Sequence, residues 1–278
     1  MPIHDQGYKH YLGSRAHGHA WIVMFRTGVL NMFQNRKWVV LMVASWIQFI
    51  VRGVQFYLAA NFSQAAIVAP TAATFRDFFD KQILFVFLVS VTLGAVSIAE
   101  DRRANALQIY LSKPLTRLEY IVGKLSVLMS FLLFITWVPA ILLLVLEIVF
   151  AGNFTFFRNN VFLVPAITVF ALIQALMWSM CILALSSLST NARFVGILFT
   201  GLIFFSEAVY GVLRGITGSS WVSFVAFSNN IAQVGDVIFR VPLRFDTPWI
   251  LSLGVVLALI GVSALILERR IRGVEIVA

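Results

Sequence analysis

The chain has 278 residues, of which 60% are hydrophobic and only 12% are charged, and its mean hydropathy is +0.91. This composition excludes a soluble globular protein, whose core needs far fewer apolar residues, and it favours a membrane protein. The net charge of +9 does not indicate nucleic-acid binding, because Lys and Arg lie at the ends of apolar runs and form no dense patch interleaved with aromatic residues.

The first segment, residues 1–19, is polar and contains all four histidines. A metal site is one interpretation, but a short tail without cysteine or an acidic cluster favours a solvated cytoplasmic segment. Residues 20–37 have apolar residues at helical spacing and predict an interfacial elbow helix, the alternative being an extension of the first span. The first long apolar run begins only near Trp38 and is longer than a signal-peptide core, so we expect the N-terminus to be retained.

Six later segments are apolar over roughly the 20 residues that a helix needs to cross a bilayer. They predict an all-α fold in which residues 38–278 form a single six-span transmembrane domain. The expected spans are residues 38–58, 82–99, 123–149, 161–185, 194–213 and 248–267.

The orientation follows from the basic residues. One side of the predicted topology collects 14 of the 21 Lys and Arg residues, namely the side that holds both chain ends. Because basic residues near span ends favour the cytoplasm, both termini are expected there. The protein is thus predicted to be integral to a membrane with both termini inside, and the inner membrane of a bacterium or archaeon is the one we expect.

The two long outer connections differ in character. Residues 59–81 contain a run of small residues and are compatible with an ordinary loop. Residues 214–247 are too apolar for a solvated loop and too short for another span, and Ile231, Val234 and Ile238 recur at helical spacing. We expect a pair of short re-entrant or interfacial helices there, with protein or water satisfying the irregular backbone.

The cytoplasmic loop after the second span predicts a short amphipathic helix at about residues 100–112. Glu100 and Asp101 suit the start of a helix, and an apolar stripe follows at i, i+3 and i+4 spacing. Pro114 is expected to end this helix because it pushes Lys113 toward an extended conformation. Thr116 and Glu119 have the spacing of a capping box that starts the next helix. On composition alone, the stripe fits either lipid headgroups or a protein partner. Its residues are Leu107, Tyr110 and Leu111.

The same loop carries a resemblance. It reads Ala-Glu-Asp-Arg-Arg from residue 99, then Leu107, then Ser-Lys-Pro-Leu-Thr-Arg-Leu-Glu-Tyr from residue 112, then Gly123-Lys124. This run resembles the signature loop of type-2, exporter-type ABC transporter permeases, which are six-span subunits that pair with separate ATPase subunits. The chain departs from the family's usual Gly-Thr before the leucine, where it has Asn105-Ala106, and this leaves its subgroup open.

The resemblance implies that residues 100–112 are a coupling helix that docks into a cleft of an ABC ATPase subunit, with the permease working as a dimer of two copies. Leu107, Tyr110 and Leu111 would fill that cleft. The basic side chains would pair with acidic groups or lipid phosphate, and Glu100 would fix the junction with the second span. The full set of implied coupling residues is Glu100, Asp101, Arg102, Arg103, Leu107, Tyr110, Leu111, Lys113, Pro114 and Arg117.

No cofactor is expected on this chain itself. Gly123-Lys124 lacks the first glycine of a phosphate-binding loop, so ATP and Mg²⁺ are expected on the partner ATPase. No catalytic cluster or metal site is predicted either, because the histidines are confined to the tail and serines in the spans lack a partnered base.

Apart from Lys124 at the start of the third span, three charged residues lie within predicted spans. A carboxylate at Glu207 is costly in hydrocarbon unless it is paired, protonated or hydrated, so it lies either in a translocation path or in a hydrogen bond to a neighbouring helix. Glu147 and Arg52 either extend toward the outer interface or pair with each other.

The leading hypothesis is an ATP-driven permease, with export implied by the resemblance. The alternatives are an ATP-independent carrier or channel and a non-transporting membrane assembly protein. A carrier gains little support, since no inverted repeat is visible.

Overall fold

The computed structural model describes residues 20–62, 69–106 and 116–271, and this part of the chain is helical with no strands. Six helical segments are long and apolar enough to cross a membrane, which confirms the predicted all-α polytopic fold. They are Arg36–Asn61, Ala72–Arg103, Arg117–Ala151, Leu163–Leu188, Ala192–Thr217 and Trp249–Arg270.

The first helix, α1 (Ala20–Gln34), occupies the position predicted for the elbow helix. It ends where Asn35 caps the next helix, because the Asn35 side chain accepts a hydrogen bond from the Lys37 amide at 3.1 Å. The first span consists of α2 (Arg36–Ser45) and α3 (Ile47–Asn61). Helix α1 packs against α7 (Arg117–Ala151), and glycines at both helices allow this close approach. A Cβ at Gly28 would lie 2.6 Å from Val127.

The second span starts earlier than predicted. Helix α4 (Ala72–Val89) begins at Thr71, which forms a capping box with Thr74, so residues 72–81 are helical and not the expected loop. Hydropathy placed the start at residue 82 because the first turns are rich in charge. Those charges are tolerated in the helix because they pair with one another and with an outer segment. The span continues through a π-helical turn, η2 (Ser90–Gly94), into α5 (Ala95–Arg103).

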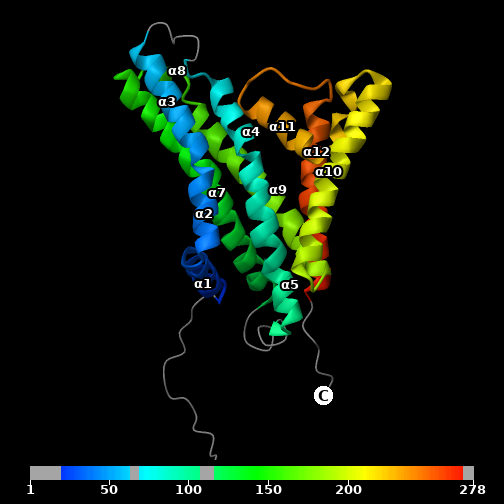
Figure 1. The fold of residues 1–278 in the computed structure, drawn as a ribbon. Helices are drawn as coiled ribbons and strands as arrows, with labels where there is room; N and C mark the ends of the chain where they lie inside the picture. Colours follow the sequence, from blue (N-terminus) through cyan, green and yellow to red (C-terminus); the bar gives the residue numbers. More distant parts are fainter. Residues whose placement is uncertain (1–19, 63–68, 107–115, 272–278) are drawn as a thin grey trace, which may run out of the picture.

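Helix α9 (Leu163–Leu188) is the central element. Within its most apolar stretch 72% of residues are buried, against 17% for the first span and 28% for α10 (Ala192–Thr217). It contacts α7, α5 and α12 (Trp249–Arg270). The first span and α10 are therefore peripheral, and Figure 1 shows them on opposite sides of α4 and α5.

The connection between α10 and α12, which is predicted to lie on the outer side, contains the two short helices expected there. The 3₁₀ helix η3 (Ser220–Val225) leads into α11 (Phe227–Ile238), and the short helix α8 (Thr155–Asn159) lies at the same end of the molecule (Figure 1). Side chains satisfy the irregular backbone around α11. Gln233 donates to the carbonyls of Phe245 and Thr247 at 3.0 and 2.8 Å.

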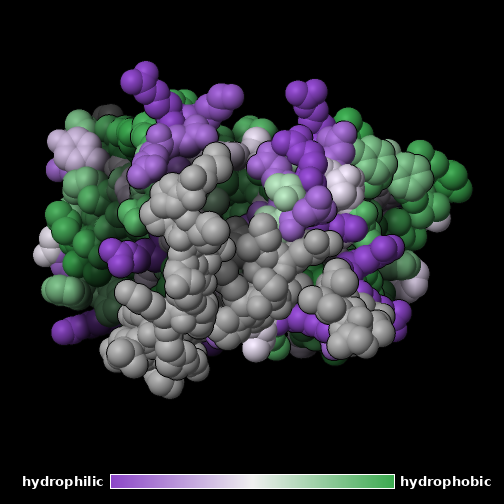
Figure 2. All heavy atoms as spheres, turned by 90° about the horizontal axis from the view of Figure 1, so that it is seen from below, coloured by the Kyte–Doolittle hydropathy of each residue, from purple (hydrophilic) through white to green (hydrophobic). Residues whose placement is uncertain are grey.

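The opposite end of the molecule holds α1 and the ends of α5 and α12 (Figure 1). Ala20 and Arg270 therefore lie at the same end, as an even number of spans requires. Seen from this end, hydrophilic side chains stand across the described surface while hydrophobic residues surround the flanks (Figure 2). This distribution matches a helical bundle whose flanks contact lipid.

Candidate functional site along the second span

The end of the second span that is predicted to be cytoplasmic differs in structure from the sequence prediction. Glu100 and Asp101 were expected to open a separate helix, but they lie in the last turn of α5, which ends at Arg103. Arg102 and Arg103 in that turn complement the negative end of the helix dipole. Asn105 then takes a left-handed conformation with φ 53°, which a non-glycine residue adopts rarely and Asn more readily than most, so the chain turns here.

Two neighbouring helices hold this end of α5. Asp101 forms an ion pair with Lys124 of α7 at 2.7 Å and accepts a hydrogen bond from the Tyr120 hydroxyl at 2.7 Å. Arg102 donates to the carbonyl of Ser187 on α9. These contacts fix the direction in which the chain leaves the second span.

Five of the predicted coupling residues lie outside the part of the chain that the structure describes. They are Leu107, Tyr110, Leu111, Lys113 and Pro114. The predicted capping box is confirmed, because Thr116 accepts from the Glu119 amide at 3.2 Å while Glu119 accepts from the Thr116 amide at 3.0 Å. Arg117 is the first residue of α7.

One face of the second span is left open along its length. Its exposed or half-buried residues follow one another at intervals of three or four. They are Ala73, Asp77, Lys81, Leu84, Leu88, Thr92, Val96 and Glu100. An α-helix has 3.6 residues per turn, so residues spaced four apart move gradually around its surface. The π-helical turn at 90–94 contains one residue more than an α-helical turn and so corrects this rotation. The π-helical turn thus keeps the open face in line from one end of the span to the other.

The π-helical turn is supported by α9. Ser186 accepts hydrogen bonds from the amides of Ile98 and Ala99 at 3.1 and 2.9 Å and donates to the Ala95 carbonyl at 2.9 Å. Its hydroxyl therefore serves the backbone groups that the change from π to α geometry would leave without partners. Such turns occur frequently at functional sites.

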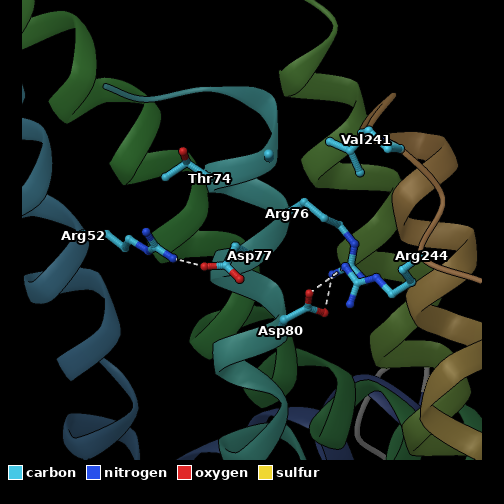
Figure 3. Close-up of a pocket in the computed structure, with 9 residues that line it drawn as sticks. Arg52, Thr74, Arg76, Asp77, Asp80, Val241 and Arg244 are labelled. Carbon is cyan, nitrogen blue, oxygen red and sulfur yellow. Dashed lines mark hydrogen bonds and ion pairs between the residues drawn. The ribbon is translucent and has the colours of Figure 1, made fainter. Parts of the chain in front are cut away.

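At its outer end the open face meets a charged cavity of about 470 Å³ between α3, α4 and the segment after α11. Figure 3 shows Arg52 reaching from α3 toward Asp77 on α4, while Arg76 and Arg244 converge with Asp80. Arg52 also donates to Gln55 at 2.6 Å. The alternative in which Arg52 pairs with Glu147 is wrong, because its ion-pair partner is Asp77.

The deepest part of this cluster is a buried ion pair. Arg76 Nε lies 3.0 Å from Asp236 on α11, and their side chains are only 3% and 0% exposed. Arg76 also binds Asp80 at 2.7 Å and the Ala232 carbonyl at 3.0 Å. Gly235 makes room for this contact, since a Cβ there would lie 2.6 Å from Arg76 Nε. The pair therefore joins the second span to the outer helix α11.

Arg244 completes the network from the loop after α11. It binds Asp236 at 2.8 Å and Asp80 at 2.9 Å. Burial acts to lower the pKa of Arg244, but its hydrogen bonds and ion pairs with Asp236 and Asp80 outweigh that effect and raise the pKa, so the guanidinium stays charged. Sequence reasoning missed Arg76, Asp80, Asp236 and Arg244. The available signal was the Arg76 and Asp80 pair at i, i+4 just before an apolar run.

Toward its other end, which is predicted to be cytoplasmic, the open face meets a second cavity, of about 760 Å³, between α2, the second span and α10. Its lining is mainly apolar and includes Trp38, Val91, Val96 and Ile197, with Arg193 as its charged residue. The two cavities lie at opposite ends of one face and differ in polarity.

The two carboxylates that the sequence marked within spans do not line these cavities. Glu207 on α10 accepts a hydrogen bond from the Ser228 amide at 3.1 Å, in the first turn of α11. Glu147 is 5% exposed, and its Oε2 has no hydrogen-bond partner among the described residues. Glu207 thus has the structural role that the sequence offered as one of two interpretations, a hydrogen bond to a neighbouring helix.

Replacing Glu207 by alanine is expected to destabilise α11 by about 1 kcal/mol, because a helix N-terminus loses its acceptor. Hydrogen exchange of the amides at residues 227–230 measures this, and we expect faster exchange in Glu207→Ala. Glu207→Gln keeps an acceptor oxygen and serves as the control, with exchange close to that of the parent. Equal acceleration in both variants would contradict the capping role.

No metal-binding cluster of His, Cys, Asp or Glu occurs in the described part of the chain. No protein-family model matches the sequence, and no curated protein matches it. The function therefore has to be argued from the site itself.

Proposed function

We propose that this chain is the membrane subunit of an ATP-driven ABC transporter, and that its substrate path runs along the open face of the second span. The observation that carries the proposal is a set of charged side chains at membrane depth, in the cavity that meets the outer end of this face. Arg52 lies nine residues before the end of the first span and Asp80 eight residues after the start of the second. At 1.5 Å per residue both lie about 12–14 Å inside the helix ends.

Charges at that depth do not face lipid. The first span has 26 residues and measures about 39 Å, against a hydrocarbon core of about 30 Å, so Arg52 falls well within the core. Ionised side chains there face a bundle interior or a water-filled cavity and mark substrate pathways. Since the cavity is open in a single chain, a second copy of the chain facing it would enclose the path.

The cytoplasmic loop supplies the argument for ATP. Its resemblance to the coupling loop of type-2 permeases favours an ABC ATPase partner, with ATP and Mg²⁺ bound by that partner. A push on residues 104–116 acts directly on α5, which Asp101 and Arg102 tie to α7 and α9. The second span then carries the displacement to the outer cavity, where Arg76 links it to α11. Exporter direction and cytoplasmic termini follow from the resemblance and the basic residues.

Affinity purification of the tagged chain from its native membrane tests the proposal. We expect a nucleotide-binding subunit to co-purify, together with ATPase activity. Changing both Tyr110 and Leu111 to Asp should abolish that association, because charged side chains cannot fill an apolar cleft without partners. Ile216→Asp, at an exposed position at the outer end of α10, is the control and should leave the association unchanged.

Three results would overturn this function. The first is that no ATPase subunit co-purifies with the chain. The second is that an ATPase subunit still co-purifies with the Tyr110→Asp, Leu111→Asp variant. The third is gradient-driven flux in vesicles that contain this chain alone, which would favour a carrier or channel.

A further inference from the structure

We infer that the cytoplasmic-side cavity binds the acyl chain of an anionic membrane lipid, with the lipid phosphate at Arg193. The inference deepens the proposed function. It rests on that function in one respect: if the substrate path runs along the open face, a lipid bound in this cavity lies on the path, and the substrate is an acyl amphiphile. The binding itself can be measured without an ATPase.

The cavity has the size and surface of an apolar ligand site. Its volume of about 760 Å³ falls in the range of about 300–1,000 Å³ that small-molecule sites occupy. Its walls are mostly apolar, and the polar groups other than Arg193 are the hydroxyls of Thr92 and Thr200. Its walls come from α2, the second span and α10, so we expect a lipid tail to enter it from the membrane between the first span and α10.

The charges around its cytoplasmic edge are complementary to an anionic headgroup. Arg193 is exposed in the first turn of α10, and no ion pair of Arg193 occurs among the described residues. Arg36 and Lys37 immediately precede Trp38, which lines the same cavity from the other side. The acid on the open face at this end is Glu100, so the balance is positive. Each basic residue near a membrane surface attracts anionic lipid.

The open face also offers a route for such a molecule. Leu84 and Leu88 lie between the two cavities on the second span, and the outer cavity presents paired charges such as Arg52 and Asp77. An apolar chain thus finds apolar side chains over the middle of the face, from Leu84 to Val96, and a charged headgroup finds polar partners at both ends. A small hydrophilic solute would match only the outer half.

Photolabelling measures this site. The full chain is reconstituted in phosphatidylcholine vesicles with a trace of a phosphatidylglycerol or phosphatidylcholine probe that carries a diazirine on its acyl chain. Mass spectrometry then quantifies labelling of residues 91–96 and 192–201 relative to the lipid-facing residues of α12. We expect preferential labelling of the cavity, and more by the phosphatidylglycerol probe.

Two variants separate the tail from the headgroup. Gly201 lines the cavity and a Cβ there meets open space, so Gly201→Trp should fill the cavity and remove the preferential labelling. Gly211→Trp lies on the same helix, where a Cβ also meets open space, and should not remove it. Arg193→Gln should keep tail labelling but lower the preference for phosphatidylglycerol about fivefold, the effect of one basic residue near a membrane surface. Arg214→Gln, at the other end of α10, is its control.

Labelling of the cavity equal to that of α12 would mean ordinary boundary lipid and would overturn the inference. Equal effects of Gly201→Trp and Gly211→Trp would also overturn it. Lipid selectivity without a co-purifying ATPase would leave this site standing and remove only the proposed ABC function.

Discussion

Replacing Asp236 by alanine is expected to lower the free energy of unfolding by up to about 3–5 kcal/mol, the cost of removing one partner of a buried ion pair, with Asp80 as the carboxylate that stays at Arg76. Arg76 is 3% exposed, so water cannot replace the lost carboxylate, and Arg244 loses the same partner. Denaturation in mixed detergent micelles, followed by loss of helical circular dichroism, measures the change.

A double variant distinguishes the unpaired charge from a general packing defect. Replacing Arg76 by Met and Asp236 by Leu removes both charges, and it should recover most of the stability that Asp236→Ala loses. Asp77→Ala is the control for an exposed pair, since the Asp77 side chain is 50% exposed, and it should cost less than about 1 kcal/mol. Similar losses in Asp77→Ala and Asp236→Ala would contradict the buried position of the second pair.

Gly94→Ala is expected to destabilise the protein by about 1–3 kcal/mol, although alanine favours helices, because the added methyl group overpacks the contact with α9. A Cβ at Gly94 would lie 2.4 Å from Ile182 Cγ2 and 2.7 Å from Cγ1. Ile182 is fully buried, and its β-branched side chain is stiff at χ1, so it cannot turn aside. The same unfolding measurement applies.

Ile182→Ala provides the matched test, because it removes both clashing carbons. The double variant should be more stable than the sum of the two single effects predicts, with a coupling of about 0.5–3 kcal/mol. Gly201→Ala is the control for helix propensity alone. Its Cβ meets open space, so it should be neutral or stabilising by up to about 1 kcal/mol. Strict additivity would show that α9 does not constrain the π-helical turn.

Local signals in the sequence predicted many of the helix boundaries. Thr116 and Glu119 form their capping box because both partners lie within one turn, so the chain alone specifies the contact. The start of the second span was predicted too late for the opposite reason. Arg76 and Asp80 look unfavourable in an apolar helix until Asp236, 160 residues after Arg76, supplies the buried partner.

The candidate site was likewise predicted only in part. The sequence marked Arg52 and Glu207 as costly charges within spans, since their cost depends only on their apolar neighbours. It did not identify their partners, Asp77 and Ser228, because those contacts join separate helices. The π-helical turn at 90–94 was also missed. Its hydrogen bonds depend on Ser186 of α9, and nothing in the local pattern marks it.

By itself the sequence determined that the chain crosses a membrane six times, because hydrocarbon demands long apolar helices wherever the backbone crosses it. It also determined the pair of short outer helices, from an apolar pattern too short to span. Only the tertiary structure decided which face of the second span stays open and which charges meet at its outer end. Those features depend on packing between helices far apart in the chain, and lipid gives little guidance, since it solvates every apolar face equally well.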